Sequence, residues 1–210
     1  MKKLLPAFLA GILTTFAFAP AGLWWLAPLT FALLFSLLLE TTPKRAFLTG
    51  WLFGAGLLCT GLVWIENSMS VYAGMPRALA ITLAMLLALG LALYYGLAAW
   101  LAVRFTRERQ KAARLIALAV LLVVMEWVRG WFLTGFPWLT IGYTQIDSWL
   151  AGYAPLGGVL LLSLLVTLTA SALAGLIRMR SLSATMPALA ILVVWSGGYL
   201  LQERTWTSPD

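Results

Sequence analysis

The chain has 210 residues, of which 62% are hydrophobic and only 10% are charged, and it contains no histidine. With a mean hydropathy of +0.95, this composition excludes a soluble globular protein with a polar exterior and predicts an integral membrane protein. The net charge of +7 does not indicate nucleic-acid binding, because the basic residues stand in short clusters between apolar runs. A single cysteine, Cys59, in a chain without histidine leaves few ligands for zinc or haem, so no metal and no cofactor is expected.

The amino terminus has the pattern of a signal peptide. Two lysines precede an apolar run that ends in the small-residue sequence Ala17-Phe18-Ala19. Pro20 directly follows the apparent cleavage site, where it should obstruct a peptidase, and a second apolar run begins within a few residues. We therefore expect the first helix to be retained.

Seven apolar segments are long enough to be considered as membrane spans. A helix that crosses the hydrocarbon core needs roughly 20 residues, and charge clusters and Pro/Gly turns mark where each segment ends. The expected spans are residues 4–19, 23–39, 47–65, 78–103, 115–133, 156–177 and 184–201. The prediction is an all-α polytopic bundle of about seven transmembrane helices over residues 1–201, followed by a tail over residues 202–210. Glycines 50, 54 and 56, with Gly61, predict close helix contacts in the third span.

Charge predicts the orientation, because lysine and arginine concentrate on the cytoplasmic side of short loops. With the amino terminus in the cytoplasm, eleven of the 14 basic residues lie on the inner side: Lys2, Lys3, Lys44, Arg45, Arg104, Arg107, Arg109, Lys111, Arg114, Arg178 and Arg180. The outer side then holds Arg77, Arg129 and Arg204, and the carboxyl terminus is extracytoplasmic. The longest connection, residues 134–155, is also outside and rich in glycine and proline. Irregular backbone at membrane depth must be buried in protein or line a polar cavity, so we expect the outer face to be the working face.

An acid and a base, Glu126 and Arg129, stand three residues apart inside the fifth apolar run. Counted from Arg114 at about 1.5 Å per residue, they lie about 18 and 22 Å into a core of about 30 Å, in its outer half. They are close enough to pair on one helix face. Two interpretations remain open. The pair is structural, or Arg129 faces a cavity and attracts a phospholipid phosphate while Glu126 orients the guanidinium.

Aromatic residues gather at the predicted outer interface, where amphipathic rings are favoured. They are Trp24, Trp25, Trp64, Tyr72, Trp131, Trp138, Trp149 and Tyr153. We expect Trp131 to anchor the interface and Trp138, beside Pro137, to form a cavity wall. Tyr143 and Gln145 are candidates for hydrogen bonds to a lipid head group or a neighbouring domain, or to the backbone of their own loop.

Several motifs in almost the whole chain form a recognisable set. The most specific is EWVRGWFLTGFPWLTIGYTQID, residues 126–147. Weaker ones, in order, are FAFAP (16–20), WWLAPL (24–29), GLVWIENSM (61–69), GMP (74–76) and LAGYAPLGGV (150–159). Together they resemble the membrane part of bacterial apolipoprotein N-acyltransferase. Glu66 departs from the pattern, since an apolar or aromatic residue is expected there. We expect it to cap the outer end of the third span.

The resemblance implies a bundle in the bacterial inner membrane that carries an extracytoplasmic nitrilase-like domain and a last helix. That domain holds the family's Glu-Lys-Cys triad, which passes an acyl group from phospholipid to the amino-terminal cysteine of a diacylated lipoprotein. By that pattern the domain would begin near Asp210, so no catalytic residue is expected within this chain, and whether the chain alone is an enzyme stays open. Cys59 is expected to be structural because no neighbouring base would form its thiolate.

The expected role of this chain is to supply a lipid-access cavity and a docking surface for that domain, with Trp206 near the junction. An alternative is a non-catalytic membrane scaffold that anchors a separately encoded enzyme. A small transporter is disfavoured, because the sequence has no internal repeat.

Overall fold

The computed structural model describes residues 3–178, 185–204 and 206. Two of the basic residues counted for orientation, Lys2 and Arg180, lie outside this part of the chain, as do residues 207–210 of the predicted tail. Within the described residues all regular structure is helical and there is no strand. The predicted all-α class is confirmed.

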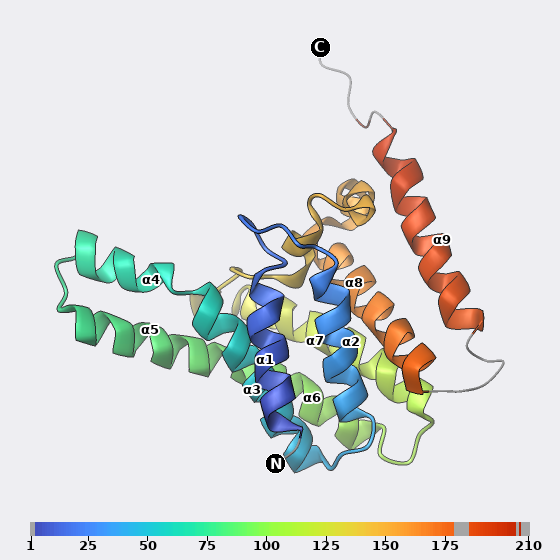
Figure 1. The fold of residues 1–210 in the computed structure, drawn as a ribbon, viewed down its shortest axis with the longest axis horizontal. Coiled ribbons are helices and arrows are strands. Elements are labelled where there is room, and N and C mark those ends of the chain that lie inside the picture. The colour runs from blue at the N-terminus through green and yellow to red at the C-terminus, as the bar shows by residue number, and fades with distance from the viewer. Residues whose placement is uncertain (1–2, 179–184, 205, 207–210) are drawn as a thin grey trace.

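Six helices form the body of the molecule (Figure 1). They are α1 (Leu4–Thr15), α2 (Leu26–Leu38), α3 (Pro43–Gly61), α6 (Leu93–Phe105), α7 (Lys111–Arg129) and α8 (Ala154–Arg178). Helix α3 packs between α1 and α6, α7 packs between α6 and α8, and α8 closes against α2. Buried aromatic rings fill the centre, where Phe31 and Phe53 lie 4.9 Å apart. Helix α9 (Thr185–Gln202) lies along one side and contacts α8.

Two helices project from this body as an arm (Figure 1). The arm consists of α4 (Trp64–Asn67), the π turn η1 (Ser68–Tyr72) and α5 (Arg77–Leu91). It leaves α3 through a bend of 44°. The third span was expected to end at residue 65 and the fourth to begin at residue 78, yet residues 66–72 between them are helical. The sequence from Trp64 to Tyr72 mixes two serines, an asparagine and Glu66 with apolar residues, and none of its residues is buried, so no core-facing pattern marks this short helix.

Glu66 does not cap the end of α3 as expected. It lies in the first turn of α4, where its Oε1 accepts hydrogen bonds from Arg77 Nε at 3.0 Å and Ser70 Oγ at 3.2 Å. This acid therefore ties the two helices of the arm together.

Within the described ranges of the chain, two helices are long and apolar enough to cross a membrane. They run from Arg77 to Phe105, as α5 and α6 in line, and from Trp149 to Arg178. The bent segments Pro43–Gly61 and Trp64–Tyr72 make a third if they form one span. Helices α1, α2 and the residues Ala188–Gln202 of α9 are apolar but shorter. The structure thus supports a helical membrane protein, while the number of seven spans stays a prediction.

Helix α1 packs tightly on α3. A Cβ on Gly11 would meet the Phe53 carbonyl oxygen, and a Cβ on Gly56 would meet the Phe8 carbonyl oxygen. Each glycine therefore lets the other helix's backbone approach, as the small-residue pattern predicts. Gly54 likewise contacts the Tyr95 ring of α6.

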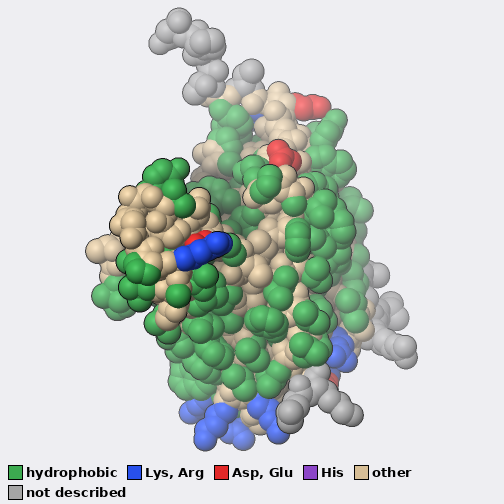
Figure 2. All heavy atoms as spheres, turned by 60° about the vertical axis from the view of Figure 1, so that its left-hand side comes forward, with side chains coloured by type: hydrophobic (Ala, Val, Ile, Leu, Met, Phe, Trp, Pro, Cys, Tyr) green, Lys and Arg blue, Asp and Glu red, His purple; other side chains and the backbone are tan. Residues whose placement is uncertain are grey.

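Basic side chains gather at the end of the body where Figure 1 places the amino terminus, and they appear as a blue cluster in Figure 2. Two of them hold the turn after α2. Lys3 Nζ donates to the Leu37 and Glu40 carbonyl oxygens at 3.1 Å each. Lys111 Nζ lies 2.7 Å from Glu40 Oε1, and this ammonium lowers the pKa of the exposed Glu40 carboxyl below its ordinary value.

Arg114 joins three helices at the same end. Its Nη1 donates to the Leu39 carbonyl oxygen at 2.5 Å, while Nε and Nη2 donate to the Thr106 hydroxyl and carbonyl oxygens at 3.1 Å each. The planar guanidinium thus ties the ends of α2 and α6 to the start of α7.

We expect Arg114→Lys to destabilise the protein by about 1.5–3 kcal/mol, the usual contribution of hydrogen bonds to a charged group. Lysine keeps the charge but cannot reach Leu39 and Thr106 together. Unfolding of the purified protein in detergent, followed by tryptophan fluorescence, measures this loss. Arg109→Lys is the matched control, because Arg109 is exposed in the connection between α6 and α7. Equal stability of the two variants would contradict the predicted role of Arg114.

Candidate functional site

The chain leaves α7 through a segment without a continuous helix, as predicted. This exit loop, residues 130–153, contains three short 3-10 turns: η2 (Phe132–Thr134), η3 (Ile141–Gln145) and η4 (Trp149–Tyr153). Leu133, Thr134 and Leu139 have positive φ angles of 51°, 76° and 56°. Such angles are uncommon outside glycine and occur where the surrounding structure enforces them.

Glu126 is one of the contacts that hold this loop. Its side chain lies in the last turn of α7 and the residue is only 5% exposed. Its Oε1 accepts a hydrogen bond from the backbone N–H of Ile141 at 2.7 Å. The carboxylate therefore satisfies a backbone donor at the start of η3, fifteen residues further along the chain.

Arg129 makes the second contact and is 1% exposed. Its Nη1 donates to the Trp138 carbonyl oxygen at 2.9 Å, and its Nη2 lies 3.8 Å from Glu126 Oε1. The predicted pair between these residues is present. Together they hold both ends of residues 138–141 against α7, so the geometry gives the pair a structural role. In the described part of the chain, Arg129 Nη2 and Glu126 Oε2 are buried without a hydrogen-bond partner.

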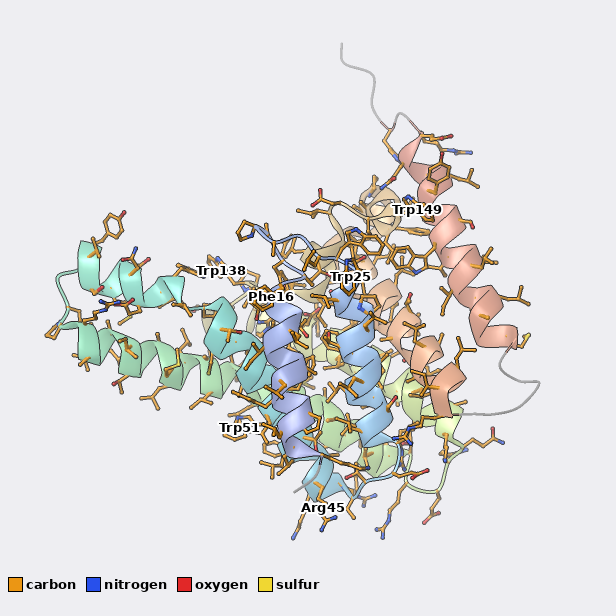
Figure 3. All side chains as sticks on the ribbon, in the orientation of Figure 1. Phe16, Trp25, Arg45, Trp51, Trp138 and Trp149 are labelled. Carbon is orange, nitrogen blue, oxygen red and sulfur yellow. The ribbon has the colours of Figure 1, made fainter. Side chains whose placement is uncertain are left out.

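The Trp138 ring lies at the protein surface, while the backbone carbonyl oxygen of Trp138 accepts the hydrogen bond from Arg129. The ring is about half exposed and packs on Phe136 and Trp64, with centroids 5.1 and 6.1 Å apart. An aromatic wall thus joins the exit loop to the base of the arm. Figure 3 shows Trp138, Trp25 and Trp149 towards one end of the molecule and Arg45 at the other. Pro137 is exposed, and its carbonyl oxygen accepts from the Thr140 hydroxyl at 2.7 Å.

Gln145 belongs to a second polar cluster within the exit loop. It is fully buried, and its Nε2 donates to the Trp24 carbonyl oxygen at 3.2 Å. Its Oε1 accepts from the Ser148 hydroxyl at 2.8 Å, and the Ser148 carbonyl oxygen accepts from Gln202 Nε2 at 2.7 Å. This cluster ties the exit loop to the turn before α2 and to α9. Of the uses predicted for Gln145, the contacts favour satisfying the backbone.

Among the described residues, the remaining predicted side chains make no hydrogen bond to the Arg129 guanidinium. Trp131 is exposed and lies edge-on against Trp127, with ring centroids 5.5 Å apart. Tyr143 is exposed on η3, and Trp206 is exposed beyond the end of α9. Their predicted roles in lipid contact or docking stay predictions.

Two polar residues near the site were missed by the sequence interpretation. Ser163 Oγ on α8 accepts a hydrogen bond from the Gly142 backbone N–H at 2.8 Å, which attaches the loop to α8 as well. Tyr95 on α6 is buried, and within the described residues its hydroxyl has no partner. Hydroxyls at 163 and 167, one turn apart in an apolar span, were the available signal for Ser163.

Among the residues that the structure describes, no group of three or more His, Cys, Asp or Glu side chains could hold a metal ion. The site consists of a fixed loop, an aromatic wall and one buried guanidinium. These groups can position another molecule or domain.

Comparisons with known proteins agree with the sequence motifs. A family model described as "Apolipoprotein N-acyltransferase N-terminal domain" matches residues 10–172. The chain is 45% identical over 207 residues to the apolipoprotein N-acyltransferase of Chromobacterium violaceum, covering 98% of this chain and 40% of the relative. It is 44% identical over 208 residues to that of Azotobacter vinelandii, covering 97% and 40%. It is 41% identical over 211 residues to that of Vibrio cholerae, covering 100% and 41%.

The chain therefore spans about two fifths of the length of these relatives. The matched family model covers most of the chain and includes α7 and the exit loop. This chain belongs to the apolipoprotein N-acyltransferase family, through that family's amino-terminal membrane domain.

Proposed function

We propose that the chain is the membrane module of an N-acyltransferase that moves an acyl chain from phospholipid to the amino-terminal cysteine of a diacylated lipoprotein. The relatives from Chromobacterium violaceum and Azotobacter vinelandii are named apolipoprotein N-acyltransferases. The observation that carries the proposal is the exit loop, whose strained backbone is fixed to α7 by Glu126 and Arg129. A loop held this firmly is suited to form the floor beneath a catalytic domain.

The proposal includes the orientation predicted from charge. The amino terminus lies in the cytoplasm of a bacterium, seven helices cross the inner membrane, and the exit loop faces outward. Support comes from the basic cluster at the end of the body opposite the exit loop (Figure 2) and from the tryptophans beside that loop (Figure 3). Tryptophan is favoured at membrane interfaces, and basic residues are favoured on the inner side.

In this proposal the chain supplies positioning, and the nitrilase-like domain supplies the catalytic triad. The aromatic wall of Trp138, Phe136 and Trp64 faces outside the helix bundle, where it is available to lipid or to the second domain. The exposed residues Trp131, Tyr143 and Trp206 are the proposed docking surface.

A chimera tests this function. Residues 1–210 replace the matching part of the Chromobacterium relative, and the chimera is expressed in bacteria depleted of their own N-acyltransferase. We expect growth to be restored and mass spectrometry to find a third acyl chain on lipoproteins. The 210-residue chain alone serves as the control and is expected to restore neither. A chimera that accumulates in the membrane but transfers no acyl group would overturn the proposal and favour a non-catalytic scaffold.

A further inference from the structure

A pocket lies at the basic end of the body, where the start of α1, the turn after α2 and the first turns of α3 meet. Its volume is about 610 Å³, within the roughly 300–1,000 Å³ that small-molecule sites occupy. Figure 3 shows Arg45, which lines the pocket, at the end of the molecule opposite Trp138 of the exit loop. The lining residues that bear on binding are Lys3, Leu4, Glu40, Thr42, Arg45 and Leu48.

Two basic side chains give the pocket its charge. Lys3 Nζ donates to the Leu37 and Glu40 carbonyl oxygens at 3.1 Å each. These bonds fix the ammonium at the pocket and use two of its three N–H donors. The Arg45 side chain is exposed, and among the described residues no carboxylate lies within ion-pair distance of its guanidinium. Both groups therefore have donors to offer an anion.

The acid in the pocket does not cancel this charge. Glu40 Oε1 lies 2.7 Å from Lys111 Nζ, so the carboxylate is already paired with an ammonium from α7. The pocket keeps the positive charges of Lys3 and Arg45. A negatively charged group is attracted here, whereas a cationic head group would meet two like charges and one paired acid.

The first turn of α3 adds backbone donors beside these cations. Thr42 precedes the helix and makes no side-chain capping bond, and the turn contains no acidic residue. The first intrahelical bond is donated by Ala46 to the Thr42 carbonyl oxygen at 2.8 Å. The earlier N–H groups of Lys44 and Arg45 have no acceptor within the helix. This helix end favours an anion and supports the two side chains that define the pocket.

The inner part of the pocket is apolar. Leu48 lies three residues after Arg45 on α3, about 4.5 Å further along the helix axis, and it is exposed. Leu4 begins α1 directly after Lys3. On both helices a cation therefore lies at the end of the body and a leucine lies deeper. A phospholipid has the same order of charged head group and acyl chain.

We propose that this pocket binds one anionic phospholipid, whose phosphate accepts hydrogen bonds from Lys3 and Arg45 while its acyl chains lie along Leu4 and Leu48. Basic pockets between transmembrane helices on the cytoplasmic side bind anionic lipid head groups. The lipid joins the ends of α1 and α3 and is structural, because the pocket lies at the opposite end of the body from the exit loop. The pocket stands by itself, whereas its place in the cytoplasmic leaflet rests on the orientation included in the proposed function.

Native mass spectrometry of the purified 210-residue chain tests the preference for an anionic head group. The probes are palmitoyl-oleoyl phosphatidylglycerol and a phosphatidylcholine with the same acyl chains, titrated in detergent. We expect the first phosphatidylglycerol to bind at least roughly tenfold more tightly than the phosphatidylcholine. Equal binding of the two lipids would overturn the role of the two cations.

Inorganic phosphate distinguishes a lipid site from a site for a small anion. We expect a large excess of phosphate to leave the phosphatidylglycerol bound, because the acyl chains bury apolar surface that phosphate lacks. Displacement of the lipid by an equal concentration of phosphate would show a site for a small anion and would overturn the lipid proposal.

Replacing Arg45 locates the binding in the pocket. Arg45→Gln should weaken phosphatidylglycerol binding about fivefold, equivalent to ~1 kcal/mol, the usual contribution of one basic residue near anionic lipid. The matched control is Lys44→Gln, which removes the same charge from the neighbouring exposed residue, whose side chain does not line the pocket. Thermal unfolding verifies that both variants are folded. Equal losses in the two variants would indicate a diffuse attraction to charge and would overturn the pocket.

Cysteine labelling separates this inference from the proposed function. Thr42 is exposed at the pocket, and Thr42→Cys is introduced together with Cys59→Ala. We expect a membrane-impermeant maleimide to label it in inverted inner-membrane vesicles but not in spheroplasts. Labelling in spheroplasts would overturn the cytoplasmic leaflet and the proposed orientation. If Arg45→Gln loses lipid while Lys44→Gln does not, and the chimera transfers no acyl group, the pocket is supported and the proposed function is not.

Discussion

Replacing Glu126 by alanine is expected to destabilise the protein by about 3–5 kcal/mol, the usual cost of removing one partner of a buried ion pair. Arg129 is 1% exposed and would keep its charge in an apolar surrounding without its carboxylate. The Ile141 backbone N–H would lose its acceptor at the same time. Chemical unfolding of the purified protein in mixed micelles measures the loss.

A double variant separates the buried charge from the lost hydrogen bonds. Glu126→Leu with Arg129→Met removes both charges and keeps most of the volume, so we expect it to be more stable than Glu126→Ala. Glu40→Ala is the control, because the Glu40–Lys111 pair is exposed and such pairs contribute little to stability. If Glu126→Ala unfolds like Glu40→Ala, the pair does not hold the loop.

The long apolar helices were the most predictable part of the fold. Residues 78–103 were expected as one span, and the structure has a single run from Arg77 to Phe105. Pro76 precedes this run and the basic residues after Arg104 end it, so both boundaries are visible in the sequence. Of the arm, α5 belongs to this predicted run, whereas α4 and η1 were missed because α4 has four residues and η1 is a π turn. Neither is long enough to produce a detectable helical period.

For the exit loop, the sequence predicts where the helix is interrupted but not the backbone conformation that follows. Gly135 and Pro137 correctly predicted the interruption of the helix, because these residues disfavour helix interiors. The positive φ angles, however, include those of Leu133, Thr134 and Leu139, which carry no such signal. Their backbone is set by contacts with distant residues, and a sequence pattern does not show which contacts form.

Only part of the candidate site was predictable, because the sequence does not show which distant residues come into contact. The spacing of Glu126 and Arg129 predicted their proximity, which depends on one helix alone. Their loop partners, Ile141 and Trp138, depend on how the exit loop folds back. A groove beside the arm is lined by residues of α5, of α6 and of α7 with the exit loop, so only the structure reveals it.

Replacing Gly56 by leucine is expected to destabilise the protein by about 3 kcal/mol, the upper part of the usual range for an overpacked core. A Cβ at this position would meet the Phe8 carbonyl oxygen and lie 3.0 Å from the Ile12 backbone nitrogen. Backbone atoms cannot rotate away as a side chain can, so α1 must move from α3. The better helix propensity of leucine offsets less than about 1 kcal/mol of this cost.

The control is the same substitution on another helix, Gly90→Leu, where the Cβ of the new side chain would meet no atom within 4 Å. Since α1 and α3 approach through a reciprocal glycine contact, Gly11→Leu should produce a loss similar to that of Gly56→Leu. Once one substitution has separated the helices, the second should add little, so the double variant should lose less than the sum of the two. Strict additivity, measured by unfolding in mixed micelles, would show that the two glycines do not share one helix contact.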